Sequence, residues 1–288
     1  MVEQQGIAEV NGTRLYYEIA GAGDPMVLLH GFGLDTRMWD DQFEAFAQHY
    51  RVVRYDMRGY GKSVPPTDES YSHTDDLKAL LEHLRIDRAH VFGQSRGGAV
   101  AIDFALAHPE ATSALVLVDP VLGEHPWSQE AARTDGAVWE TAAKSGVEAG
   151  KARWLAHPLF APAQEKPEVA ARLGRIVSDY SGWHLINTDP VRYPDPPAAQ
   201  RLHEIGAPTL IVVGERDLPD FHVIADTLLR IPDARKVVLA GVGHMCNMEN
   251  PTKFNEVVLD FLADLYGRSR HHFSAFSPAL RVALYGRQ

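Results

Sequence analysis

Cysteine is nearly missing from this chain, because Cys246 is the only one among its 288 residues. A single cysteine cannot close an intramolecular disulfide, which fits a reducing compartment. Basic residues are also in the minority, since 28 Lys and Arg stand against 38 Asp and Glu and give a formal net charge of −10. An acidic surface repels phosphate backbones and anionic lipid headgroups, so the composition argues against nucleic-acid and membrane-surface partners.

Long apolar runs are lacking as well. The apolar stretches are short bursts such as residues 114–118, too short to span a bilayer. Residues 1–5 show no basic start followed by an apolar segment, so we expect no signal peptide and a cytoplasmic protein. His, Cys and carboxylate residues show no metal-ligand spacing, and no G-x-G-x-x-G opens a strand–helix unit. We therefore expect neither a metal nor a cofactor.

What is present is a regular alternation of short apolar runs and amphipathic segments. Asn11-Gly12 supplies the positive φ angles of a tight turn and predicts a hairpin between the first two strands. Strands that alternate with helices imply a mostly parallel sheet with helices on both faces. The pattern predicts an α/β fold with eight strands at 7–10, 13–20, 26–29, 52–55, 89–92, 114–118, 209–213 and 236–239, and helices at 37–48, 74–84, 97–107, 221–229 and 251–265.

The alternation is interrupted between the sixth and seventh strands. Residues 121–200 are rich in helix formers, with helices expected at 129–149 and 167–180, and we interpret this region as an inserted helical lid. The alternative is a set of ordinary packing helices. The predicted organisation is a core of residues 1–120 and 201–266, a lid of residues 121–200 and a C-terminal extension of residues 267–288.

Residues 93–97 read Gly93-Gln94-Ser95-Arg96-Gly97, between a predicted strand and a predicted helix. In this context G-x-S-x-G forms a nucleophile elbow, a sharp turn that presents the serine at the carboxyl edge of the sheet. Side chains at positions 93 and 97 would collide with neighbouring backbone, which explains the two glycines. We expect Ser95 to be the nucleophile.

His30-Gly31-Phe32-Gly33 directly follows the buried strand at 26–29. The backbone N–H groups of Phe32 and Arg96 are expected to form an oxyanion hole, in which each donor is worth about 3 kcal/mol in the transition state. For His30 we prefer a structural role in which it bonds loop backbone.

A serine hydroxyl needs a base, and the base needs an acid to orient it. His244 stands among glycines just after the strand at 236–239, whereas His184, His203 and His222 fall in the lid or in predicted helices. Asp217 follows the strand at 209–213 and is favoured as the acid. Asp119, at the end of the strand at 114–118, is the rival, unless it only caps the segment that enters the lid.

The order Ser95, Asp217, His244 and the segment 56–63, Asp-Met-Arg-Gly-Tyr-Gly-Lys-Ser, make the chain resemble the α/β-hydrolase superfamily over about residues 5–266. The resemblance assigns nucleophile, acid and histidine to these three residues and the oxyanion donors to Phe32 and Arg96. The chain is most similar to small lidded esterases, enol-lactonases and carbon–carbon bond hydrolases. This implies a hydrolase without a cofactor and leaves its substrate open.

Two residues of the elbow depart from the pattern of many relatives, which carry His before the serine and Met or Leu after it. Here these positions are Gln94 and Arg96. In halo-acid dehalogenases of this fold an arginine after the nucleophile helps to hold the substrate carboxylate. Arg96 therefore either binds a carboxylate or polarised carbonyl of the substrate, or is buried beside the elbow and paired with an acid such as Asp103 or Asp119. Trp183 and His184 are weaker candidates for substrate contacts from the lid.

Taken together, the sequence predicts a serine hydrolase that cleaves a carboxylic ester or lactone, with a small molecule as its substrate. A carbon–carbon bond hydrolase acting on a vinylogous diketone would use the same three residues. A ligand receptor with this fold is a further alternative. Cys246, which no elbow presents, is expected to be a packing residue.

Overall fold

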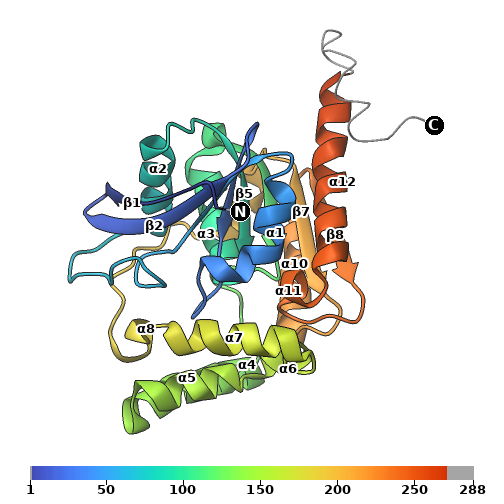
Figure 1. Ribbon diagram of the computed structural model, residues 1–288. Helices are drawn as coiled ribbons and strands as arrows, with labels where there is room; N and C mark the ends of the chain where they lie inside the picture. Colours follow the sequence, from blue (N-terminus) through green and yellow to red (C-terminus); the bar gives the residue numbers. More distant parts are fainter. Residues whose placement is uncertain (1, 271–288) are drawn as a thin grey trace.

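The computed structural model describes residues 2–270, and its sheet begins with the predicted hairpin (Figure 1). Asn11 and Gly12 have φ angles of 46° and 68° and join β1 (Gln4–Val10) to β2 (Thr13–Ala20). The eight strands are ordered β1-β2-β4-β3-β5-β6-β7-β8, and β2 is antiparallel to both of its neighbours while the others pair in parallel. The remaining strands are β3 (Pro25–Leu29), β4 (Arg51–Tyr55), β5 (Ala89–Gln94), β6 (Thr112–Val118), β7 (Thr209–Gly214) and β8 (Ala234–Leu239). The predicted eight-stranded, mostly parallel sheet is confirmed.

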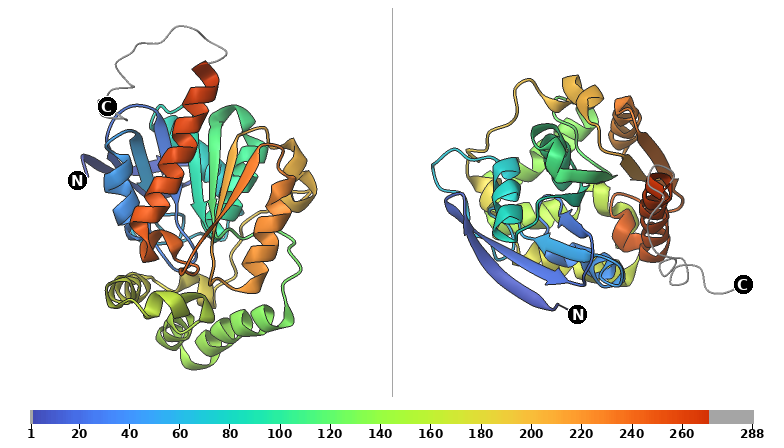
Figure 2. Two further views of the ribbon diagram at one scale, coloured as in Figure 1. Left: turned by 90° about the vertical axis from the view of Figure 1, so that its right-hand side faces the viewer. Right: turned by 90° about the horizontal axis from the view of Figure 1, so that it is seen from above.

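Helices cover both faces of this sheet (Figure 2). On one face lie α1 and α12, and on the other lie α2, α3 and α10. Their bounds are α1 (Asp40–Phe46), α2 (His73–His83), α3 (Arg96–Ala107), α10 (Pro219–Thr227), α11 (Cys246–Glu249) and α12 (Pro251–Arg270), with 3-10 turns η1 (Thr36–Trp39), η2 (Pro109–Ala111), η3 (Pro158–Phe160), η4 (Leu202–Glu204) and η5 (Leu228–Arg230). Proline at the first position starts both α10 and α12, where its missing N–H costs no hydrogen bond.

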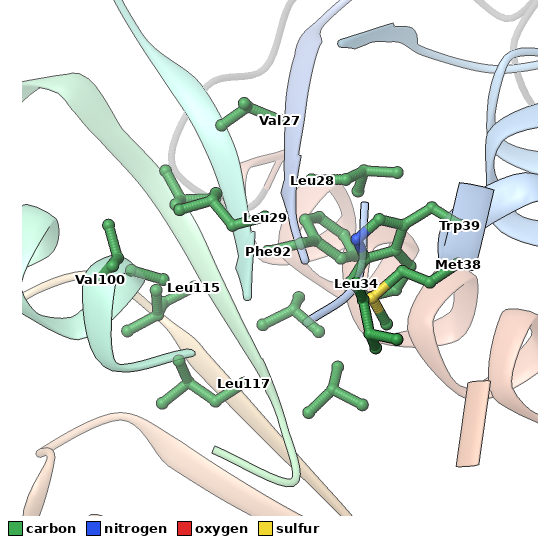
Figure 3. Packing of buried hydrophobic residues seen from close by; sticks show 14 of the residues in the cluster. Val27, Leu28, Leu29, Leu34, Met38, Trp39, Phe92, Val100, Leu115 and Leu117 are labelled. Carbon is green, nitrogen blue, oxygen red and sulfur yellow. The ribbon is translucent and has the colours of Figure 1, made fainter. Parts of the chain in front are cut away.

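The core lies on both sides of the central strands, because successive side chains of a strand point to opposite faces. In Figure 3, Leu28 of β3 and Phe92 of β5 gather with Trp39, while Leu29 lies on the other side, near Val100 of α3. These side chains are buried, and Leu28 and Phe92 are paired in register. The two-sided burial explains why β3 and β5 read as continuous apolar runs.

The inserted region forms a helical layer below the carboxyl edge of the sheet (Figure 1). Ion pairs from Arg37 to Asp179 and from Arg172 to Asp41 tie it to the core. Its helices are α4 (Gln129–Ser145), α5 (Val147–Leu155), α6 (Ala161–Gln164), α7 (Pro167–Asp179), α8 (Trp183–Ile186) and α9 (Ala198–Arg201). The continuous helix predicted at 129–149 is wrong, because Gly146 takes a φ of 90° and separates α4 from α5.

The last described helix, α12, extends to Arg270, five residues beyond the predicted end at 265. Most of the C-terminal extension predicted at 267–288 lies outside the described residues. Within residues 2–270, no helix combines the length and the apolar character needed to cross a bilayer.

Candidate active site

Ser95 sits in a strained turn between β5 and α3. Its φ and ψ angles are 51° and −115°, a conformation that side chains rarely adopt and that the surrounding structure must impose. A Cβ at Gly93 would lie 2.1 Å from the carbonyl oxygen of Gly97, and one at Gly97 would lie 2.5 Å from that of Leu29. The predicted collision of side chains at 93 and 97 with backbone is therefore confirmed. The strand–turn–helix geometry is that of a nucleophile elbow.

His244 and Asp217 are joined by a buried hydrogen bond. The Nδ1 atom of His244 lies 2.8 Å from Oδ2 of Asp217, and the two side chains are 3% and 0% exposed. The other carboxylate oxygen of Asp217 accepts the backbone N–H of Leu218 at 2.7 Å. Both residues follow parallel strands, so their loops meet at the edge of the sheet where the elbow ends.

Asp119 lies beside this pair without taking the place of Asp217. Its Oδ1 accepts the N–H of Gly214 at 2.8 Å, and its backbone has a positive φ of 43°. Burial, followed by the charge of Asp217, raises the pKa of the Asp119 carboxyl well above its usual value. The structure therefore bonds His244 to Asp217, and it gives Asp119 a backbone partner at the end of β7.

Two buried side chains hold the loop of His244: Gln94, noted in the sequence only as a departure from the elbow pattern, and Glu249, which was not singled out. The amide of Gln94 donates to the carbonyl oxygen of His244 at 3.1 Å, so the residue before Ser95 binds the residue proposed as its base. Glu249 accepts the N–H groups of Gly243 and Met245 at 2.9 and 3.2 Å. The position of Gln94 in the elbow was a usable signal, whereas Glu249 carries no motif that would have found it.

The hydroxyl of Ser95 makes no hydrogen bond to any other described residue. Hydrogen bonds between a nucleophile and its base often tighten only when the substrate binds, so this geometry is compatible with catalysis. Ser95 is buried at the carboxyl edge of the sheet, with 9% of its surface exposed.

The loop after β3 places Phe32 between the elbow and the inserted helices. The Phe32 ring packs on Trp154 at a centroid distance of 5.3 Å and on Trp139 at 5.4 Å. His30 bonds backbone through both ring nitrogens, accepting the N–H of Met57 at 2.9 Å and donating to the oxygen of Gly31 at 2.8 Å. Burial lowers the pKa of His30 to about 4, so it is neutral, and the structural role predicted for it fits these bonds.

The segment 56–63 builds the neighbouring wall. Asp56 accepts the N–H groups of Thr36 and Lys62, each at 2.8 Å, and burial raises its pKa to about 6. Gly61, with a φ of 50°, packs so close to this carboxylate that a Cβ would lie 2.2 Å from it. These local bonds fix the geometry of the segment, so its residues have a structural role and the structure assigns them no chemistry.

Arg96 pairs with an acid that the sequence analysis did not consider. Its Nη2 lies 3.2 Å from Oδ2 of Asp189, in the segment that leads back from the inserted helices, and Tyr71 donates to Oδ1 of the same carboxylate at 2.9 Å. The side chain of Arg96 is 24% exposed. The expected pairing with Asp103 or Asp119 is not found; Asp189 takes their place because the inserted region folds back over α3.

His184 is fixed within a group of aromatic rings. It stacks on Tyr60 at 4.3 Å, its Nδ1 is 2.9 Å from the hydroxyl of Tyr180, and burial lowers its pKa to about 3. Trp183 packs edge-on against His184 at 5.0 Å. These contacts show how the inserted region is held on the core, and the substrate contacts of both residues stay a prediction.

A cavity of about 420 Å³ opens next to the elbow. Its walls are the α3 face that carries Arg96 and Val100, the residue Val121 after β6, and the returning segment with Tyr193. Neither Ser95 nor His244 lines it. The cavity is thus adjacent to the elbow and reaches it through Arg96, which immediately follows the serine.

Among the described residues, Asp119, Asp217 and His244 are the group whose ligand atoms, all within 4.8 Å of one another, could hold a metal ion. Two of these residues already bind each other, since Asp217 accepts a hydrogen bond from the ring of His244, and one oxygen of Asp119 accepts the N–H of Gly214. The arrangement fits an acid–histidine pair better than a metal centre.

Comparison with known proteins agrees with this geometry. A family model described as the alpha/beta hydrolase fold matches residues 24–251. The 2-hydroxy-6-oxononadienedioate/2-hydroxy-6-oxononatrienedioate hydrolase of Paraburkholderia phymatum is 32% identical over 271 residues, covering 86% of this chain and 91% of the relative. The structure of Est816, described as an N-acyl homoserine lactone degrading enzyme, is 30% identical with a TM-score of 0.73, covering 89% of this chain and 100% of that one.

The enol-lactonase from Burkholderia xenovorans LB400 is 28% identical, with a TM-score of 0.74 and coverage of 90% of this chain and 100% of that one. The similarity to proteins that act on esters, lactones and carbon–carbon bonds matches the resemblance predicted from the motifs. With the sheet order, the elbow and the family match in agreement, this chain belongs to the α/β-hydrolase fold family.

Proposed function

We propose that this protein is a serine hydrolase that cleaves a carboxylic ester or lactone of a small molecule. The observation that carries the proposal is the buried bond of 2.8 Å between His244 and Asp217, on loops at the sheet edge where the strained elbow presents Ser95. Asp217 holds Nδ1 of the imidazole, which leaves Nε2 as the atom that takes the proton of the serine.

In the proposed reaction the Ser95 oxygen attacks the substrate carbonyl while Nε2 of His244 accepts its proton. The N–H groups of Phe32 and Arg96 stabilise the negative charge on the carbonyl oxygen. The bond to the alcohol then breaks, and the alcohol leaves with the proton from His244. Water attacks the acyl-enzyme after losing its proton to the same histidine, and the acid is released.

Arg96 is proposed to contact the substrate through the neighbouring cavity. The pairing with Asp189 compensates its charge, so it favours a neutral polar group over a free carboxylate. Trp183 and His184 are proposed to influence the substrate indirectly, through the packing of the inserted helices on Tyr60.

Hydrolysis of a carbon–carbon bond is the second candidate, and the 32% identity with the hydroxy-oxononadienedioate hydrolase favours it. A panel of p-nitrophenyl esters, lactones and vinylogous diketones separates the two reactions. We expect turnover of esters or lactones and covalent labelling of Ser95 by an organophosphonate, with both lost in Ser95→Ala. Turnover confined to the diketones would select the second candidate, and labelling of another residue would contradict both.

A further inference from the structure

A second carboxyl group is buried against the acid of the proposed triad. A carboxyl oxygen of Asp119, one of Asp217 and a ring nitrogen of His244 all lie within 4.8 Å of one another. Asp119 is 0% exposed, and the side chain of Asp217 is also 0% exposed. Two negative charges this close and shielded from solvent repel strongly, which favours a state in which one of the two carboxyl groups holds a proton.

The two carboxyl groups differ in their hydrogen-bond partners. Both oxygens of Asp217 accept N–H groups, one from Leu218 and one from the imidazole of His244, and such bonds favour a carboxylate. Asp119 has one N–H partner, that of Gly214, and its Oδ2 is buried without a hydrogen-bond partner. An orphaned buried oxygen is costly as an acceptor but becomes a donor when protonated.

We propose that Asp119 is a positioning residue that stays protonated and donates a hydrogen bond from Oδ2 to the carboxylate of Asp217. No proton is consumed or released, because the proton remains between the two oxygens throughout the reaction. The bond spreads the charge of Asp217 and limits how strongly it holds a proton on His244. This inference rests on the proposed function, in which His244 is the base.

Helix α11 contributes Cys246 and Glu249 to the surroundings of Asp119. Cys246 lies against it from α11, where burial and the nearby Asp119 raise the pKa of the thiol well above its usual value. Glu249, also in α11, accepts two backbone N–H groups and is a source of further negative charge. A thiol is a weak donor, and the negative charge of Asp217 acts on Asp119 in favour of its protonated form.

The direction of a pH shift tests the proposal. In Asp119→Ala the Asp217 carboxylate loses a donor and becomes more basic, so the acidic limb of kcat/KM moves to higher pH by about half to one unit and kcat falls. Asp119→Asn keeps a donor amide and an acceptor oxygen, so it restores the limb and most of kcat. If Asp119 were ionised, both variants would remove a negative charge, and the limb would move to lower pH in each.

A matched control and a measurement without turnover complete the test. Cys246→Ala should leave the limb in place, and a shift equal to that of Asp119→Ala would assign the effect to the thiol instead.

Infrared difference spectra at pH 7 between Ser95→Ala and Ser95→Ala with Asp119→Asn should show the carbonyl stretch of a protonated carboxyl group lost with Asp119. Its absence overturns the inference even if Asp119→Ala fails to fold. Retained activity in Ser95→Ala would contradict the proposed function. The infrared comparison would still report whether Asp119 is protonated, so the two proposals can fail separately.

Discussion

Replacing Asp217 by Asn should nearly abolish activity because of the way its two oxygens are used. The backbone N–H of Leu218 donates to Oδ1 at 2.7 Å, so the amide oxygen of an asparagine must stay there. The amide NH₂ then faces Nδ1 of His244 in place of Oδ2, at 2.8 Å. Two donors cannot face each other, so Nδ1 becomes the acceptor and Nε2 carries the proton. An imidazole in that tautomer cannot take the proton of Ser95.

The wrong tautomer in a serine hydrolase lowers kcat by about 10⁴-fold, which corresponds to about 5.4 kcal/mol in the activation free energy. The assay is steady-state hydrolysis of a p-nitrophenyl ester, with circular dichroism to verify folding. Glu215→Gln and Asp220→Asn are matched controls, because these nearby acids bind the N–H of Gly241 and Ser128 instead of His244. We expect each control to keep kcat within about threefold of wild type, an effect of less than 1 kcal/mol. More than a tenth of wild-type kcat in Asp217→Asn, or an equal loss in a control, would refute the reasoning.

Gly97→Ala places a Cβ 2.5 Å from the carbonyl oxygen of Leu29, so it should lower the free energy of unfolding by more than about 2 kcal/mol and abolish activity. Gly136→Ala meets nothing within 4 Å inside α4, so it should raise the free energy of unfolding by about 0.5–1 kcal/mol. Urea unfolding measures both values, and similar values for the two variants would contradict the packing argument. Burial raises the pKa of Asp103 to about 7 in the folded protein. Because the folded-state pKa is raised, the stability of the protein falls as pH rises from about 4 through 7. Asp103→Asn should therefore raise Tm at pH 8 and not at pH 4. A constant difference in Tm across that range would show that the carboxyl does not titrate. Asp189→Asn frees Arg96 of its counter-ion and should lower KM for a carboxylate-bearing ester about tenfold relative to its neutral analogue. An unchanged ratio of the two KM values would exclude contact between Arg96 and the substrate.

The sequence alone determined the features that depend on local chemistry. Asn11-Gly12 specifies its turn because few other residues accept its φ angles, and Gly93 is required by a backbone contact with Gly97 within one strand–turn–helix unit. Parallel strands place their carboxyl ends at one edge, so the pattern also indicated that Ser95, Asp217 and His244 would meet there.

Tertiary structure decided which partner each of these groups takes. Asp119 and Asp217 both follow adjacent parallel strands, and only the packed side chains show that Asp217 binds His244 while Asp119 binds Gly214. Asp189, the counter-ion of Arg96, lies 93 residues further along the chain. Such choices depend on distances between segments remote in sequence and on buried charges that compete for the same donors, and no local pattern encodes either.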